Sequence, residues 1–459
     1  MMGPLAARDG KLFHVGFNLD DRVPADHPLR RIDRVIDFSF VRPMVAALYG
    51  HNGHVSLDPT LLLRLLFLCF FENVRSEREL MRQLPMRLDW LWFCRLDLDS
   101  DIPDHSVLCK ARRRWGERTF ERVFARVVRC CQEAGLIEGK TVHADSTLLR
   151  ASASLEGRVS RVLWEQLERA SLPAEQATPA ASSVDQEEQP KGGDDQSGGS
   201  GAANDSTDAT ANSTPNPTVN QSSNESSTPH RNEHRSERRG ERLNDRLVSP
   251  VDPDAATATR RAGGTTLGYR DHRLIDDRCG IILASVATPA DRDDGSMLEE
   301  LLMRQRDYND SSPKEVVGDS MYGTRDNYAL LKREGVKAYL KKRRGKDSPR
   351  VSWLKLLPAD CSPARALKLL ARRKSRAEGS FAQAHVRMNH RRCRWRRRWS
   401  VQIQCYLVAT VQNLQKLARH CCRALESRLP RGRQILEALP AQLMQQNDNG
   451  SLKITCGAI

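Results

Sequence analysis

The sequence predicts a mixed α/β fold (α+β, with a mixed sheet) that follows a helical N-terminal region. Three observations lead to this prediction: residues 1–135 carry helix signals, strand-like runs begin at Lys140, and helices and strands then alternate until about Leu429. A chain of 459 residues can hold two or three domains and bury a sizeable core. A polar insert, residues 172–247, interrupts the strand region after its first strand.

The N-terminal region contains the start and stop signals of helices. Asp58-Pro59 places an N-cap before a proline in the first turn, and Ser76–Glu79 fits a capping box. Between Thr119 and Ala134 apolar residues recur at helical spacing, which predicts one buried face closed by a left-handed cap at Gly135. That face consists of Phe120, Val123, Phe124, Val127, Val128 and Cys131.

The insert has the composition of a disordered segment. Ser, Thr, Asn, Asp, Gln, Gly and Pro dominate it, and residues 172–229 contain no aromatic side chain. Such a segment cannot bury enough apolar surface to offset its ordering entropy, so we predict disorder.

After the insert the order of elements indicates a topology. The expected elements are a hairpin of Thr265–Arg273 and Cys279–Thr288, a helix at about 295–307, a strand ending at Asp319, a helix from Thr324 to Glu334, and a strand at Val336–Leu340. With the first strand, Lys140–Asp145, this is the order of a ribonuclease H-like core. In that topology the first and fourth strands lie side by side, so Asp145 and Asp319 are expected to be neighbours. The insert need not disturb this pairing, because loop length adds little closure entropy.

Charge and composition restrict the class of protein. The formal net charge is +15 and the pI is about 9.5, which favours an acidic partner such as nucleic acid. The longest apolar run, Leu61–Phe71, is too short to span a bilayer, and the N-terminus lacks an apolar signal core. We therefore expect a cytoplasmic protein that does not bind membranes. The twelve cysteines form no C-x-x-C motif, which argues against a zinc ribbon.

Three acidic residues stand in contexts suited to metal binding. Asp145 and Asp319 end strand-like runs, and Glu378 lies on an expected helix in the most basic stretch of the chain. Two divalent ions about 3.5–4 Å apart can activate the attacking hydroxyl and stabilise the leaving oxygen of a phosphodiester, and Mg²⁺ prefers oxygen ligands. Each acid alone is more often a turn residue or a surface ion pair. Together they predict a catalytic site that binds two Mg²⁺ ions, or Mn²⁺ in their place, in a nuclease or strand-transfer enzyme acting on DNA.

Position along the chain favours Glu378 as the third acid. The other acids between Asp319 and Glu378 are Asp326, Glu334, Asp347 and Asp360, and those after Glu378 are Glu426, Glu437 and Asp448. The first two fall on the helix directly after Asp319, and the next two lie in a connection that contains Pro and Lys. Glu378 leaves room for a helix, a strand and a return to the site.

The stretch from Ala371 to Arg398 contains eleven Lys and Arg residues and one acid. Phosphate neutralisation by such a run would dominate affinity for DNA, and the expected DNA contacts are Lys374, Arg387, Arg391, Arg392, Arg394, Arg396, Arg397 and Arg398. Trp395 and Trp399 either stack on bases or pack in the core. Two other basic segments, Lys110–Trp115 and His230–Arg239, are either DNA contacts or solvated.

Several motifs in a shared order resemble those of the DDE transposases of bacterial insertion sequences. In the helical region they are Asp58–Leu66, Arg75–Leu80, Trp92–Asp97 and Ile102–Ser106. In the catalytic region they are Val142–Thr147, Ser249–Asp254, Gly268–His272, Val317–Gly323, Ala377–Phe381 and Val411–Leu417. Two departures from the family stand out: the polar insert is longer than the resemblance leads one to expect, and residues around the third acid differ. The family often has Tyr and Arg seven and four residues before the catalytic Glu and Lys seven after it, where this chain has Ala371, Lys374 and His385. Arg387 could substitute for that lysine.

The resemblance implies a transposase that cleaves DNA at the ends of its element and transfers the strand into target DNA. Its partners would be the terminal inverted repeats, the target DNA and further copies of the chain, as a homodimer or higher oligomer at the nucleoid. Two alternatives are an impaired relative that acts as a DNA-binding repressor and a nuclease without strand transfer. The implied domains are a helical DNA-binding and dimerisation domain at 1–135, a catalytic domain at 136–430 that contains the insert at 172–247, and a C-terminal tail at 431–459.

Overall fold

The computed structural model describes residues 2, 18–50, 55–171, 242–259, 264–343 and 352–428. The predictions for most of the insert, for His230–Arg239 and for the tail at 431–459 lie outside the described residues. Contacts divide the chain into two units, residues 1–161 with 243–459 and residues 162–242. The helical region and the sheet both belong to the first unit, so a domain boundary near residue 135 stays a prediction.

The N-terminal region is helical, as predicted. Its helices are α1 (Leu19–Arg22), α2 (Pro28–Val35), α3 (Val41–Val45), α4 (Pro59–Phe71), α5 (Glu77–Gln83), α6 (Leu88–Cys94) and α7 (Ser106–Glu133). Helix α4 begins at Pro59 as expected and is buried from there to Phe70. The Ser76 hydroxyl accepts a hydrogen bond from the Glu79 N–H, which confirms that half of the capping box. The predicted apolar face of α7 is wholly buried, and Gly135 has a φ of +71°.

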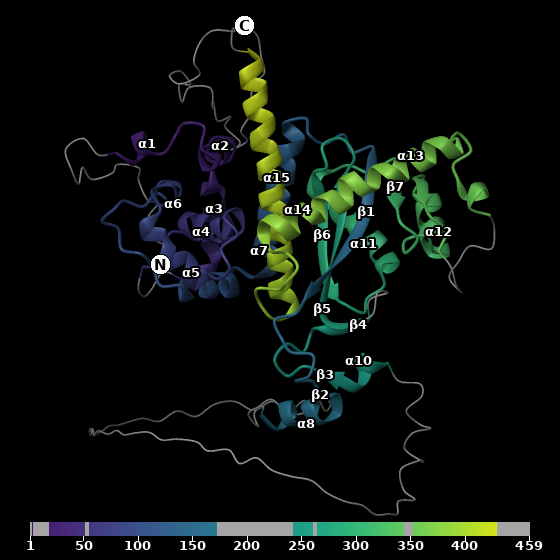
Figure 1. Cartoon of the computed structure of the whole chain (residues 1–459), viewed down its shortest axis with the longest axis horizontal. Helices are drawn as coiled ribbons and strands as arrows, with labels where there is room; N and C mark the ends of the chain where they lie inside the picture. The colour runs from purple at the N-terminus through teal and green to yellow at the C-terminus, as the bar shows by residue number, and fades with distance from the viewer. Residues whose placement is uncertain are drawn as a thin grey trace, which may run out of the picture. The chain divides into compact units, whose positions relative to one another are not determined.

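One mixed sheet forms the second part of this unit. Its strands are β1 (Thr141–Arg150), β4 (Ala256–Thr259), β5 (Thr265–Asp276), β6 (Ile282–Pro289), β7 (Glu315–Gly318) and β8 (Lys337–Leu340). They are ordered β4-β5-β1-β7-β8, with β6 also paired to β5. Strands β1, β5 and β6 are antiparallel, whereas β7 and β8 run parallel to β1. The predicted ribonuclease H-like order is therefore present (Figure 1).

Helices connect and cover these strands. They are α11 (Leu298–Asn309) after the short turn η6 (Asp294–Met297), α12 (Arg325–Arg333), α13 (Pro363–Arg373), the π-helix η8 (Lys374–Glu378), α14 (Gly379–Met388) and α15 (Arg398–Arg428). As predicted, the Thr324 hydroxyl caps α12 by accepting from the Asn327 N–H. Strands β2 (Val159–Ser160) and β3 (Leu247–Val248) form a separate two-stranded sheet.

Helix α15 joins the helical region to the sheet. It packs against α2, α4 and α7 and also against β6 (Figure 1). The Gln402 amide bonds the Ala287 N–H and the Ser285 carbonyl, and the Asn413 amide bonds both backbone groups of Ile282. These side chains satisfy backbone groups along the outer side of β6 that would otherwise lack partners. The helix therefore fixes the sheet edge with polar contacts as well as apolar ones.

The described part of the second unit is mostly helix α8 (Arg161–Ser171). Its apolar side chains Val162, Leu163 and Leu167 are exposed. Among the described residues, none of the helices is both long enough and apolar enough to cross a membrane.

Candidate active site

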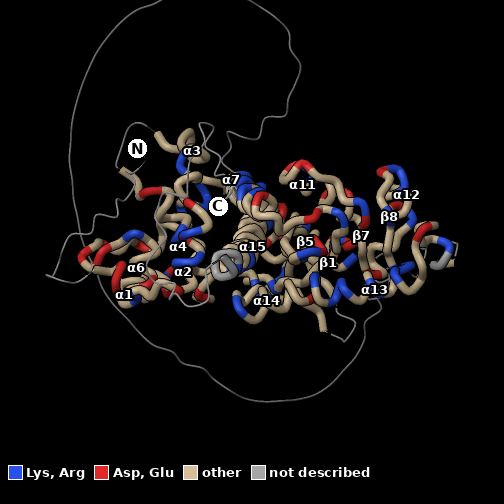
Figure 2. The backbone as a smooth tube through the Cα atoms, turned by 90° about the horizontal axis from the view of Figure 1, so that it is seen from above, with Lys and Arg blue, Asp and Glu red and all other residues tan. Residues whose placement is uncertain are grey.

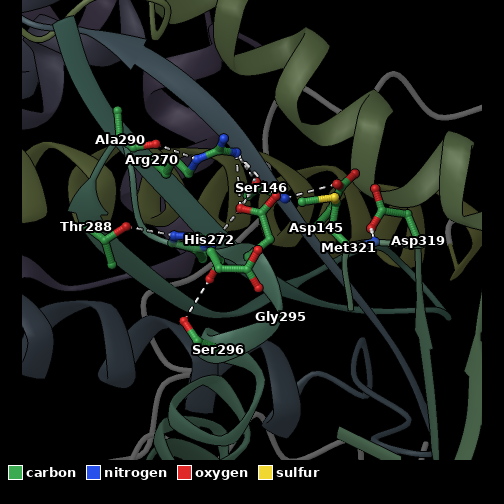
Figure 3. A network of polar contacts seen from close by, with 12 residues as sticks. Asp145, Ser146, Arg270, His272, Thr288, Ala290, Gly295, Ser296, Asp319 and Met321 are labelled. Carbon is green, nitrogen blue, oxygen red and sulfur yellow. Dashed lines mark hydrogen bonds and ion pairs between the residues drawn. The ribbon is translucent and has the colours of Figure 1, made fainter. Parts of the chain in front are cut away.

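Two adjacent parallel strands bring two of the predicted acids together. The prediction that Asp145 ends its strand is wrong, because β1 continues to Arg150, whereas Asp319 directly follows the end of β7. Strand β1 pairs with β7 so that His143 lies opposite Val317. Two residues further along each chain stand Asp145 and Asp319, and Figure 3 shows their side chains next to each other. Because side chains alternate along a strand, equal steps from a paired position keep both carboxylates on one face. The predicted juxtaposition of Asp145 and Asp319 is thus present in the fold.

Glu378 comes from a helical segment and lines the same cavity as Asp145 and Asp319. It is the last residue of η8, between α13 and α14. Asp145, Asp319 and Glu378 all line one open cavity of about 350 Å³, together with Arg373, His385 and Arg391. The structure thus collects the three predicted acids, and one predicted DNA contact, Arg391, around a single space.

The electrostatics of Asp145 reflect its burial among other acids. Its side chain is 12% exposed, and burial raises the pKa of its carboxyl group to about 7. Arg373 opposes this rise, whereas the negative charges of Asp319 and Glu378 add to it. The Asp145 carboxylate also accepts a hydrogen bond from the Ser146 N–H. A divalent cation would relieve the repulsion between these carboxylates.

Arg373 is a site residue that the sequence did not predict. Its Nη1 atom lies 2.8 Å from Asp145 Oδ2, and its Nη2 atom lies 3.2 Å from Glu378 Oε1. The family resemblance pointed instead to Lys374, four residues before Glu378, where the family often has arginine. The π-helix η8 takes up one more residue in its turn, so the residue five positions earlier faces Glu378 instead. Lys374 is exposed and does not line the cavity.

His385 faces the cavity as a neutral side chain. Burial and nearby positive charges, chiefly His390, lower its pKa to about 4. Its Nε2 atom lies 3.2 Å from the Thr147 hydroxyl, and its ring stacks on Phe381. The cation that the family often carries at this place is therefore absent from His385. Arg387, the suggested substitute, is exposed and is not part of the cavity lining.

Comparison with known families identifies the chain. A model described as "Transposase domain" matches residues 17–114, and a model described as "Transposase DDE domain" matches residues 196–414. The chain is an insertion-sequence DDE transposase. The second match contains Asp319 and Glu378 and begins after Asp145, so the case for Asp145 rests on the geometry above. The same comparisons match no curated protein and no solved structure.

The carboxylates of the transposase fit a hard divalent cation. The three acids offer oxygen ligands only, which suits Mg²⁺ or Mn²⁺ better than a softer metal. A second cluster, Asp271, His390 and Cys405, is also close enough for a metal. There, however, Asp271 already accepts from Arg273 and Ser285, and both nitrogens of His390 have partners in Asp271 and Gln404. We interpret this second cluster as a structural network.

That buried network holds helix α14, which begins directly after Glu378. Arg273 is fully buried, bonds Asp271 on its own strand, and donates to Ser380 on α14 and Gln412 on α15. Its guanidinium also lies 4.6 Å from the ring centroid of Phe381. The family motifs Gly268–His272 and Val411–Leu417 therefore meet behind the site and fix the start of α14 against the sheet.

A further polar network contacts strand β1 directly beside Asp145, at Ser146. The Ser146 hydroxyl donates to Asp294 at 2.7 Å, and Arg270 donates to the same carboxylate. Figure 3 shows Ser146 next to Arg270. His272 is fully buried beside it and bonds the Thr288 hydroxyl. Sequence reasoning missed Asp294, since an acid before a helix is an ordinary capping residue.

The basic stretch divides between residues that line the cavity or are exposed and residues that face the protein. Arg391 lines the cavity, while Arg387 and Arg392 are exposed (Figure 2 shows the Lys and Arg residues along α13 and α14). The prediction that Arg394 contacts DNA is wrong. Its guanidinium donates to the carbonyls of Cys69, Val74 and Met388 and lies over the ring of Phe70. Those contacts make it a structural residue that is not available to phosphate.

The remaining predicted DNA contacts are exposed but tied to the protein. The Arg396 side chain donates to the Ser152 carbonyl, and that of Arg398 pairs with Glu117. Arg397 lies 3.9 Å from Asp254, and its N–H donates to Asp252. Contact of Arg396, Arg397 and Arg398 with DNA therefore stays a prediction.

Trp395 and Arg112 pack together in the protein. The Arg112 guanidinium lies 3.8 Å from the Trp395 ring centroid, and Phe70 meets the same tryptophan edge to face. Arg112 is buried and pairs with Glu77. Trp395 therefore belongs to the core, and the run Lys110–Trp115 is neither wholly solvated nor wholly available to DNA.

Proposed function

We propose that this transposase catalyses metal-dependent cleavage of DNA at the ends of its element and transfers the cut strand into target DNA. The observation that carries the proposal is the convergence of Asp145, Asp319 and Glu378 on one open cavity, from the middle of β1, the end of the adjacent strand β7 and a facing helix. This is the arrangement that phosphoryl transfer needs, since carboxylates from separate elements can hold two cations around one phosphate.

Each residue has a role in this proposal. Asp145, Asp319 and Glu378 would hold two Mg²⁺ ions, or Mn²⁺ in their place, and the bound ions would supply the charge that activates the attacking oxygen and stabilises the leaving one. Arg391 would bind a phosphate at the rim of the cavity. Arg387, Arg392, Arg396, Arg397 and Arg398 would extend this contact along the backbone of the DNA.

The partners follow from the same proposal. Terminal inverted repeats and target DNA would be the substrates, and the helical region, residues 1–135, would bind the repeats and mediate dimerisation. The excess of Lys and Arg over Asp and Glu, 73 against 58, favours binding to a polyanion of this kind.

The test replaces each acid by its amide. Asp145→Asn, Asp319→Asn and Glu378→Gln should each abolish cleavage of a DNA that carries the element's ends and leave DNA binding nearly intact. Each change removes a metal ligand and leaves the arginines in place. Binding is measured by fluorescence anisotropy and cleavage by gel electrophoresis in Mg²⁺ and Mn²⁺. Asp326→Asn is the matched control, since it changes an acid outside the cavity. Full cleavage by one of the three variants would exclude that residue.

A second candidate is a DNA-binding repressor, and His385 favours it. At neutral pH the His385 side chain is uncharged, so the cavity lacks the cation that the family often places at this position. A wild-type chain that binds its ends and cuts in neither Mg²⁺ nor Mn²⁺ would support the repressor. Cleavage without joining to a target would instead indicate a nuclease.

A further inference from the structure

Arg373 occupies the oxygens that a metal would need. One of its nitrogens contacts Asp145 Oδ2 and the other contacts Glu378 Oε1. The other oxygen of Asp145 accepts the Ser146 N–H. Both oxygens of Asp145 therefore already have donors, and a cation that binds this carboxylate has to compete with at least one of them.

Local backbone geometry fixes Arg373 in this position. The residues Lys374–Glu378 form the π-helix between α13 and α14, and its wider turn brings Arg373 to face Glu378. The Arg373 side chain is 12% exposed, as is that of Asp145, while that of Glu378 is 54% exposed. An ion pair that is this well buried is screened little by solvent, so it competes effectively for Asp145.

We propose that Arg373 is an internal cation that holds Asp145 and Glu378 together and has to leave them when the first divalent ion binds. This inference rests on the proposed function, because it concerns the same metal site. A metal ion that binds Asp145 Oδ2 or Glu378 Oε1 would repel the guanidinium at the same oxygen, so metal binding there and retention of both ion pairs oppose each other. The released guanidinium remains at the wall of the cavity that a phosphate would enter. Metal uptake would thus be coupled to the appearance of a phosphate-binding group.

Calorimetric titration of the full chain with Mn²⁺ at pH 8.5, without DNA, tests the coupling. Arg373→Gln should bind Mn²⁺ roughly tenfold more tightly than the wild type, because the competing charge-assisted hydrogen bonds are gone. Arg373→Lys should fall between them, since an ammonium cannot bridge two carboxylates as a planar guanidinium does. Lys374→Gln is the matched control: it removes a neighbouring exposed charge and should leave Mn²⁺ affinity unchanged.

The outcomes separate this inference from the proposed function. Asp145→Asn should lose most Mn²⁺ affinity if the carboxylates form the metal site at all, and its failure to do so would refute that site. If Asp145→Asn loses affinity and Arg373→Gln binds Mn²⁺ as the wild type does, or more weakly, then Arg373 does not compete and the inference is wrong. Thermal unfolding in EDTA verifies that each variant is folded. If Arg373→Gln does not fold, the Mn²⁺ affinity of Arg373→Lys decides whether Arg373 competes with the metal.

Discussion

Residues 371–391 and residues 392–398 belong to one basic stretch of the sequence, yet they face different surroundings. In the first part Arg373 and Arg391 line the cavity with the three acids. In the second part Arg394 points into the protein, and Arg397 and Arg398 are tied to Asp252 and Asp254 through their backbone N–H groups. Charge density along a sequence therefore does not tell which arginines meet a phosphate.

The physical reason lies in unpaired backbone carbonyls. Helix α4 ends at Phe71, and the carbonyls of its last turn have no partners within the helix. The segment between α14 and α15 passes this helix end, so Arg394 can donate to the carbonyl of Cys69 and to that of Val74 beyond it. An arginine with such carbonyls in reach acts as a helix cap. Arg373, in the first part, has the carboxylates of Asp145 and Glu378 in reach instead.

The largest expected effect concerns the pH dependence of stability on the cavity side. The folded-state pKa of Asp145, about 7, lies above its ordinary value of 3.8. The folded state therefore binds a proton more tightly than the unfolded state, and the stability that this adds is lost as pH rises from about 4 to about 7. In EDTA, the free energy of unfolding of the wild type should fall by up to about 4 kcal/mol relative to that of Asp145→Asn across that pH range. Urea unfolding at a series of pH values measures the difference, and parallel curves for the two proteins would refute the raised pKa.

The next effect concerns the protein-facing side. Arg394→Ala should lower the free energy of unfolding by about 3 kcal/mol, because it leaves three backbone carbonyls without their charged donor. Arg396→Ala is the matched control: its side chain is exposed and has a single long contact with Ser152, so its cost should stay within about 0.5 kcal/mol. Urea unfolding at one pH compares them. Equal stabilities of the two variants would mean that Arg394 is not structural.

Much of the fold could be predicted from the sequence, and the reasons are local. Proline and capping residues marked the starts of α4 and α12, apolar spacing marked the buried face of α7, and strand order placed Asp145 beside Asp319. The capping and spacing signals depend on residues within one or two turns of each other, whereas the neighbouring positions of Asp145 and Asp319 follow from the order of the elements along the chain. The room needed after Asp319 for a helix, a strand and a return indicated Glu378, which the structure places at the same cavity.

Arg373 and Arg394 could not be predicted in the same way. The first depends on a π-helix, which differs from an α-helix by a single residue in one turn and has no strong sequence signal here. The second depends on where a connecting segment passes a helix end more than 300 positions earlier in the chain. Asp294 was missed for a related reason, since its partners Ser146 and Arg270 come from two different strands.

The smallest expected effect is on DNA affinity at the cavity. Arg391→Ala should weaken binding to a short fluorescent duplex of any sequence and reduce the slope of log affinity against log salt by about 0.9, the value for one lost phosphate contact. His385→Lys should raise the slope by a similar amount, since it puts a cation where the neutral imidazole now faces the cavity. Neither change should alter stability as Arg394→Ala does, because neither side chain is a donor to buried carbonyls. If Arg391→Ala keeps the wild-type slope, phosphate does not meet the cavity wall, and the contrast drawn between Arg391 and Arg394 is wrong.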